Sequence, residues 1–175
     1  MKKTKLCAPG VKDSYTCFSK KGLVNILNFL NKNNEKKIKF SSKSGKRVLW
    51  SKINDEFKQN CSDEYCWTKQ PSVKKNKFIL KTKKNIFRPE MPSHWKKNIS
   101  EWLSTEDIEN VLNQYEKKYK DFIFIGAVPI DFDSKLGPGV CVVNELCNIN
   151  IKNLFDSGIR RIGIIFNFDP HNKDG

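Results

Sequence analysis

Few side chains in this sequence have the types and the spacing that catalysis requires. The first candidates for a catalytic pair are the six cysteines and two histidines: Cys7, Cys17, Cys61, Cys66, Cys141, Cys147, His94 and His171. A thiol nucleophile needs a histidine base beside it. Neither histidine lies in a sequence setting that indicates a cysteine partner. The sequence therefore does not predict a complete Cys–His pair.

Cys61 and Cys66 are also the cysteines to test as zinc ligands. A structural zinc site also needs a second pair of ligands elsewhere. Cys7 with Cys17, and Cys141 with Cys147, do not supply a well-spaced second pair. We therefore expect the cysteines to be small buried apolar residues rather than metal ligands.

The remaining candidates have ordinary structural explanations. Asp131 and Asp133 resemble a paired-carboxylate site, but two aspartates after a strand usually form a turn. His94 lies in a proline-rich approach to a helix and is expected to be exposed or half-buried, and His171 is expected to be solvated. The sequence has no glycine-rich phosphate loop, HExxH or GxSxG. We predict no catalytic, cofactor-binding or metal-binding residue.

The charge balance points to polyanions as partners. The 175 residues include 33 Lys and Arg against 19 Asp and Glu, a net charge of +14. Such a field favours nucleic acid, an acidic membrane surface or an acidic protein partner. Lysine far outnumbers arginine, which argues against sequence-specific base recognition. The run 74–84, KKNKFILKTKK, is open to two interpretations: a nucleic-acid contact or, more often for such runs, a solvated connection.

The first residues, MKKTKLCAPG, have no apolar run behind their basic start, so they do not predict a secretory signal. No apolar stretch approaches the length of a membrane span. We expect a soluble intracellular protein with no membrane contact, whose cysteines are reduced.

The elements that would position these residues fall into two parts. Ser19 is placed to cap a helix over 19–33, and a second helix is predicted over 48–59. The basic segment that follows is interpreted as a linker, with the domain boundary at 70–95. Ser104 or Thr105 then opens a helix that extends to about Tyr119. Buried strands are predicted at 122–128 and 162–168, a short strand at 140–143 and a short helix at 151–156. Residues 172–175 predict a hairpin turn. The order is that of an α+β fold.

Two stretches in the second half resemble a known family. The segment 102–108, WLSTEDI, is similar to the helix start that opens the catalytic domain of Ulp1/adenain-type cysteine proteases. The segment 163–175, GIIFNFDPHNKDG, resembles the strand and turn that precede their catalytic His-Trp. The resemblance is greatest to the SUMO-protease-like enzymes of large DNA viruses, of the African swine fever virus protease type, and covers about 15–175.

The resemblance implies a helical arm domain at 1–70, a basic, proline-containing linker at 71–95, and the incomplete first part of a papain-like, Ulp1-like core at 96–175. In such an enzyme the histidine base would follow within a residue or two of Gly175. The orienting residue, the oxyanion-hole glutamine and the nucleophilic cysteine lie further on. No catalytic residue carries over, and neither His94 nor His171 takes the base role.

The resemblance also implies a function. The complete enzyme would hydrolyse viral polyproteins during virion maturation, in the host cytoplasm (the viral factory) or the virion, without a cofactor. We expect these 175 residues to be truncated before the chemistry and inactive alone. Two alternatives stay open: a stand-alone basic protein that binds nucleic acid or a capsid partner, and a pseudo-protease that folds alone as a scaffold.

Overall fold

The computed structural model describes residues 6–11, 15–98 and 100–171. It divides into two compact units, Met1–Arg88 and Pro89–Gly175. Helix and sheet are both present, as an α+β protein requires. In the described part of the chain, no helix is long and apolar enough to cross a membrane.

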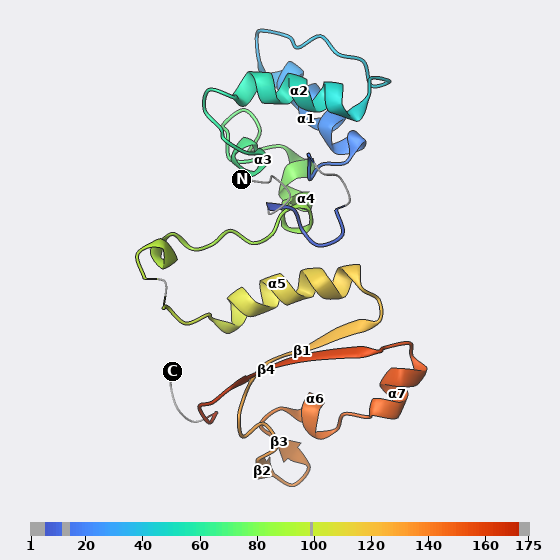
Figure 1. Ribbon diagram of the computed structural model, residues 1–175, viewed down its shortest axis with the longest axis vertical. Helices are drawn as coiled ribbons and strands as arrows, with labels where there is room; N and C mark the ends of the chain where they lie inside the picture. Colours follow the sequence, from blue (N-terminus) through green and yellow to red (C-terminus); the bar gives the residue numbers. More distant parts are fainter. Residues whose placement is uncertain (1–5, 12–14, 99, 172–175) are drawn as a thin grey trace. The chain divides into compact units, whose positions relative to one another are not determined.

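Helix α1 (Lys20–Asn33) begins where the sequence predicts. The Ser19 hydroxyl accepts a hydrogen bond from the Gly22 amide at 3.1 Å and so caps the first turn. Its apolar stripe is fully buried, and it consists of Leu23, Ile26, Leu27 and Leu30. Helix α2 (Lys46–Phe57) packs against α1, as Figure 1 shows. Both helix predictions are confirmed.

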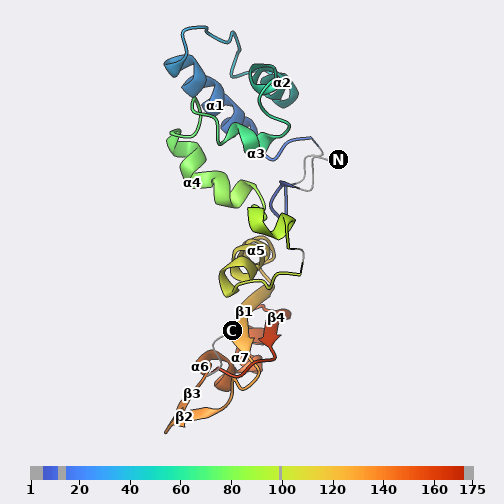
Figure 2. The same ribbon diagram turned by 90° about the vertical axis from the view of Figure 1, so that its left-hand side faces the viewer.

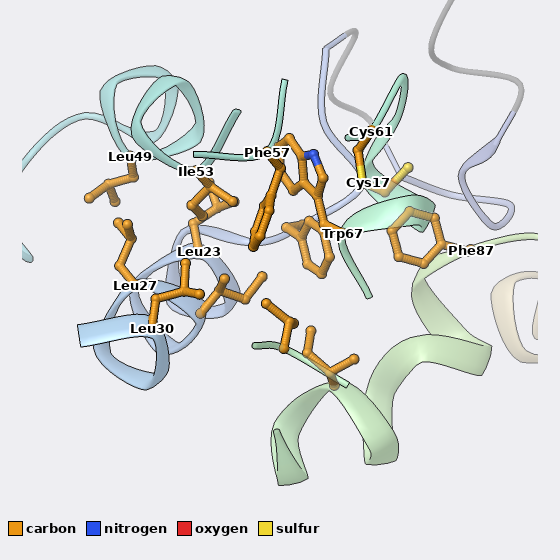
Figure 3. Close-up of a cluster of buried hydrophobic side chains, with 14 of the residues drawn as sticks. Cys17, Leu23, Leu27, Leu30, Leu49, Ile53, Phe57, Cys61, Trp67 and Phe87 are labelled. Carbon is orange, nitrogen blue, oxygen red and sulfur yellow. The ribbon is translucent and has the colours of Figure 1, made fainter. Parts of the chain in front are cut away.

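The core of the first unit gathers around Trp67 at the end of α3 (Glu64–Trp67), as Figure 3 shows. The Trp67 side chain is 1% exposed, and its ring stacks parallel to that of Phe18 at a centroid distance of 6.3 Å. Glu64 is the buried acid of this core. Its carboxylate accepts hydrogen bonds from the Cys17 amide at 2.7 Å and from the Trp50 indole at 2.5 Å. These bonds offset the cost of burying a charge.

The basic segment 74–84 is not a connection, and this prediction is corrected. Helix α4 (Lys77–Ile86) occupies most of it, capped by the Asn76 side chain. Val73, Ile79 and Phe87 are at most 1% exposed and belong to the core of the first unit. One apolar side chain every few residues anchors the segment, while its lysines remain in water. Lysine also has a high helix propensity.

All six cysteines lie among the described residues, and all are paired. The bridges are Cys7–Cys17, Cys61–Cys66 and Cys141–Cys147. The prediction of reduced thiols is therefore wrong. Each pair is close in sequence, so a local turn brings the two Cα atoms to 5.2, 5.5 and 6.4 Å, within the range for a disulfide.

The second unit starts with the short 3-10 helix η2 (Ser93–Lys96) and then helix α5 (Thr105–Lys118). A capping box opens α5: the Ser104 hydroxyl accepts from the Asp107 amide, and the Asp107 carboxylate accepts from the Ser104 amide at 3.0 Å. This confirms the predicted start. Helix α5 packs against strand β1 (Phe122–Pro129).

Strands β1 and β4 (Arg161–Asn167) form a parallel two-stranded sheet. Figure 2 shows α5 on one side of it, with α6 and α7 on the other. Both strand positions are confirmed, but β4 is mostly exposed, contrary to the buried strand predicted. A two-stranded sheet has too little cover to bury it. The register shifts at Gly126, whose φ of 145° suits a bulge that glycine accommodates best.

The crossover from β1 to β4 contains four short elements: β2 (Lys135–Gly137), β3 (Val140–Cys141), α6 (Asn144–Cys147) and α7 (Ile151–Asp156). The first two pair antiparallel. The predicted helix at 151–156 is confirmed, and Gly158 follows it with a φ of 96°. The predicted hairpin turn at 172–175 lies outside the described residues.

Candidate functional site

The carboxyl ends of β1 and β4 meet at one edge of the sheet, and a pocket of about 510 Å³ lies there. Its walls are mainly apolar and come from the approach to α5, from both strands and from the end of β3; they include Trp102, Ile108, Val128, Val143, Phe166 and Phe168. In open sheets with parallel strands, the carboxyl edge is the usual place for a ligand. This pocket is therefore the best candidate site in the second unit.

His171 lies in the pocket wall and is held by Asp131. Its imidazole Nδ1 lies 2.6 Å from Asp131 Oδ2, and its backbone amide donates to Oδ1 at 2.9 Å. Asp131 lies in the turn after β1, where its own carbonyl accepts from the Ser134 amide at 2.9 Å. The carboxylate of Asp131 thus holds both the ring and the backbone amide of His171, shortly after the end of β4.

The charge on Asp131 decides which nitrogen of the His171 ring carries the proton. The hydrogen bond from the His171 imidazole is the main reason why the pKa of Asp131 lies below its ordinary value. Because the carboxylate is then ionised, Nδ1 carries the proton and donates it. In the neutral ring this leaves Nε2 as an acceptor. Catalytic triads use a carboxylate to orient an imidazole in a similar way, but this contact gives His171 a fixed position and not a catalytic role.

No cysteine among the described residues is a free thiol. All six sulfurs are in disulfides, so none offers a thiolate to His171. Cys141, at the end of β3, also accepts a hydrogen bond from Lys135 Nζ at 3.0 Å. The described residues therefore contain an oriented imidazole but no Cys–His pair.

The opposite end of the sheet is fixed by an ion pair between an aspartate and an arginine. Arg161, at the start of β4, donates from Nη2 to Asp121 Oδ1 at 2.7 Å and from Nε to Oδ2 at 3.1 Å. This bidentate bond lowers the pKa of Asp121 and raises that of Arg161. The Arg161 guanidinium also lies 5.1 Å from the centroid of the Tyr119 ring. The register that brings Asp131 to His171 is therefore secured from both ends.

The other predicted residues stand apart from this pocket. Asp131 does lie in a turn, as predicted, and Asp133 is exposed beside it. His94 lies 3.1 Å from Glu101 through Nε2 and Oε1, with 60% of its side chain exposed. His171 is exposed as a residue but not free, because Asp131 binds it. The sequence predicts a hairpin after the second strand and so does not predict the Asp131–His171 pair. Two parallel strands would place the residues that follow them at the same edge of the sheet, and this was the signal that could have revealed the pair.

The sequence of this chain is similar to that of a known viral protein. Over 138 residues the chain is 40% identical to a protein of Acanthamoeba polyphaga mimivirus named "Putative thiol protease". The chain is related to a viral thiol protease. The matched segment covers 76% of this chain and 42% of the mimivirus protein, so the chain spans less than half the length of its relative. No protein-family profile and no solved structure matches the chain.

Proposed function

We propose that this chain is the N-terminal part of a viral Ulp1-like cysteine endopeptidase that processes viral polyproteins during virion maturation. The observation that carries the proposal is the 40% identity to the mimivirus thiol protease. The papain-like, Ulp1-like fold belongs to the same proposal. It is supported by the helix start at Ser104 and by the strand that ends before His171.

In this proposal the 175 residues are inactive alone. Their cysteines are all in disulfides, and the relative is more than twice as long as the matched segment. The catalytic histidine, its orienting residue and the nucleophile come from sequence beyond these residues. The Asp131–His171 pair then holds the backbone that leads from β4 towards the catalytic histidine. The pocket at the carboxyl ends of the strands adjoins the substrate.

The test has two arms. The purified chain is incubated with a fluorescent polyprotein reporter that contains a small-residue linker, and we expect no turnover. The chain is then fused to the part of the mimivirus protein that the match leaves uncovered, and we expect cleavage that iodoacetamide abolishes. Alkylator-sensitive cleavage by the 175 residues alone would overturn the claim of inactivity. A folded fusion that cleaves no reporter, when the intact mimivirus protein does, would overturn the family assignment.

A further inference from the structure

A second candidate binding site lies in the first unit, on a surface that the protease proposal does not use. A groove of about 460 Å³ separates the exposed face of α1 from the start of α4. Its walls carry lysines, asparagines and two phenylalanines, and no acidic residue lines it. That composition differs from the apolar pocket of the second unit.

Three lysines give the groove its charge. Lys32 comes from the last turn of α1, and Lys75 and Lys77 flank the cap of α4. All three are exposed, and none of their ammonium groups forms a hydrogen bond or ion pair with any part of the chain that the structure describes. Three unpaired cations around one concave surface attract an anion, because their repulsion is relieved only when it binds.

The start of α4 adds a donor that lacks an acceptor. Asn76 Oδ1 caps the helix by accepting from the amides of Phe78 at 2.9 Å and Ile79 at 3.4 Å. Asn76 is 2% exposed, and its Nδ2 is buried without a partner among the described atoms. A buried donor without an acceptor is costly, and native proteins rarely leave one. Asn76 is one of the residues that line the groove, which places this donor next to the space that a ligand oxyanion or base carbonyl would occupy. The helix N-terminus favours the same charge.

Two half-buried aromatic rings complete the groove. Phe29 lies on α1, and Phe78 in the first turn of α4. The Phe78 ring packs closely on α1, because a Cβ at Gly22 would lie 3.2 Å from it. Aromatic faces beside a cationic groove are the combination with which proteins bind unpaired bases and their phosphates.

We propose that this groove binds single-stranded nucleic acid, with phosphates at the lysines and the start of α4 and a base against the phenylalanine rings. Exposed Lys74 and Lys81 continue the positive surface beyond the groove, which favours a polymer over a single phosphate group. Lysines supply charge without a bidentate pattern, so the binding is insensitive to sequence. The proposal is independent of the protease function.

The test compares two variants with the same change in net charge. One carries Lys32→Glu, Lys75→Glu and Lys77→Glu; the control carries Lys36→Glu, Lys39→Glu and Lys43→Glu, at exposed positions outside the groove. Affinity for a dye-labelled 12-nucleotide oligo-dT is measured by fluorescence anisotropy on the full chain, from 50 to 300 mM salt. We expect the groove variant to bind at least ~10-fold more weakly, with a salt slope smaller by about 2. The control should stay within about 3-fold of wild type.

A second pair of variants tests the donor itself. Asn76→Ser and Asn76→Asp both keep an oxygen that can cap α4, but both remove Nδ2. We expect the serine variant to bind about 3-fold more weakly. The aspartate variant should lose more affinity, because its charge repels phosphate. Circular dichroism should show unchanged helix content in both variants.

The proposal is overturned by wild-type protein that does not bind at 50 mM salt, by equal losses in the two lysine variants, or by wild-type affinity in Asn76→Asp. Equal or tighter binding of a 12-base-pair duplex, or of a phosphoserine peptide of matched charge, overturns the single-strand assignment.

Discussion

At the scale of single residues, the second unit depends on Asp131 more than its place in an ordinary turn suggests. Its two carboxylate oxygens bind the backbone amide and the ring of His171, 40 positions away. The aspartate next to it in the turn, Asp133, is exposed. Two neighbouring carboxylates thus have different roles, and the sequence alone does not separate them.

The lowered pKa of Asp131 gives a pH prediction. Its folded-state pKa lies below the ordinary value of ~3.9, so its contribution to stability is complete above that pH. The contribution is lost as the pH falls through the lowered pKa. We expect Asp131→Asn to lower the urea midpoint of the second unit at pH 6 and to flatten its fall towards pH 3. The midpoint can be followed through amide NMR signals of β1.

Asp133→Asn is the matched control, since it removes a carboxylate from the same turn. It should leave the midpoint at pH 6 unchanged. If Asp131→Asn kept the wild-type midpoint at every pH, the pair would have no part in stability.

Gly163 on β4 gives a second prediction at this scale. A Cβ here would lie 2.8 Å from Cζ of Phe122, which is on the neighbouring strand β1. We expect Gly163→Ala to destabilise the second unit by about 1–3 kcal/mol, because the ring or the strand must move. Gly137→Ala is the control, because a Cβ there meets nothing within 4 Å. Equal urea midpoints for the two variants would contradict this packing.

At the scale of elements, local signals were sufficient for most helices. Ser19 and Ser104 stand before apolar residues with helical spacing, and both caps form. Helix α4 was missed because its lysines hide a sparse set of apolar anchors that includes Ile79. The strand positions were also predicted, but their pairing was not. Parallel pairing depends on which segments meet in space, and neither composition nor period encodes that. The disulfides are local, at separations of 10, 5 and 6 residues, and they were missed because a reducing compartment was expected.

Helix α4 can be tested with neighbouring side chains. Ile79 is 1% exposed and Leu80 is 66% exposed, although they are adjacent in the sequence. We expect Ile79→Ala to destabilise the first unit by about 2–5 kcal/mol, because it leaves a cavity in the core. Leu80→Ala should stay within about 0.5 kcal/mol of wild type. Similar urea midpoints for the two variants would restore the interpretation of the segment as a solvated connection.

At the scale of the whole molecule, the two units are built differently. The first has a continuous core of leucine, isoleucine and aromatic side chains around Trp67. In the second, the buried apolar side chains among the described residues are Phe124, Val128, Cys141 and Leu146. The larger part of the second unit's apolar surface remains accessible, including Trp102 and Phe168.

The three disulfides give a prediction for the whole chain. Alkylation of the unfolded, non-reduced protein should add no mass, and alkylation after reduction should add six labels, as read by intact-mass spectrometry. Reduction should also lower the thermal stability of the first unit, because Cys7–Cys17 and Cys61–Cys66 no longer restrict its unfolded chain. Labels on the non-reduced protein purified from an oxidising solution would contradict the pairing.

The side-chain contacts at the two ends of the β1–β4 sheet also affect which changes of sequence the fold can accept. Asp121–Arg161 and Asp131–His171 each join residues 40 positions apart, so they close the same crossover from both sides. Once one closure has formed, the second adds little further loss of chain entropy. Doubling the length of such a loop costs only ~0.6 kcal/mol. The crossover can therefore gain or lose residues around Gly137–Gly139 over evolutionary time, while the pocket at its end keeps its geometry.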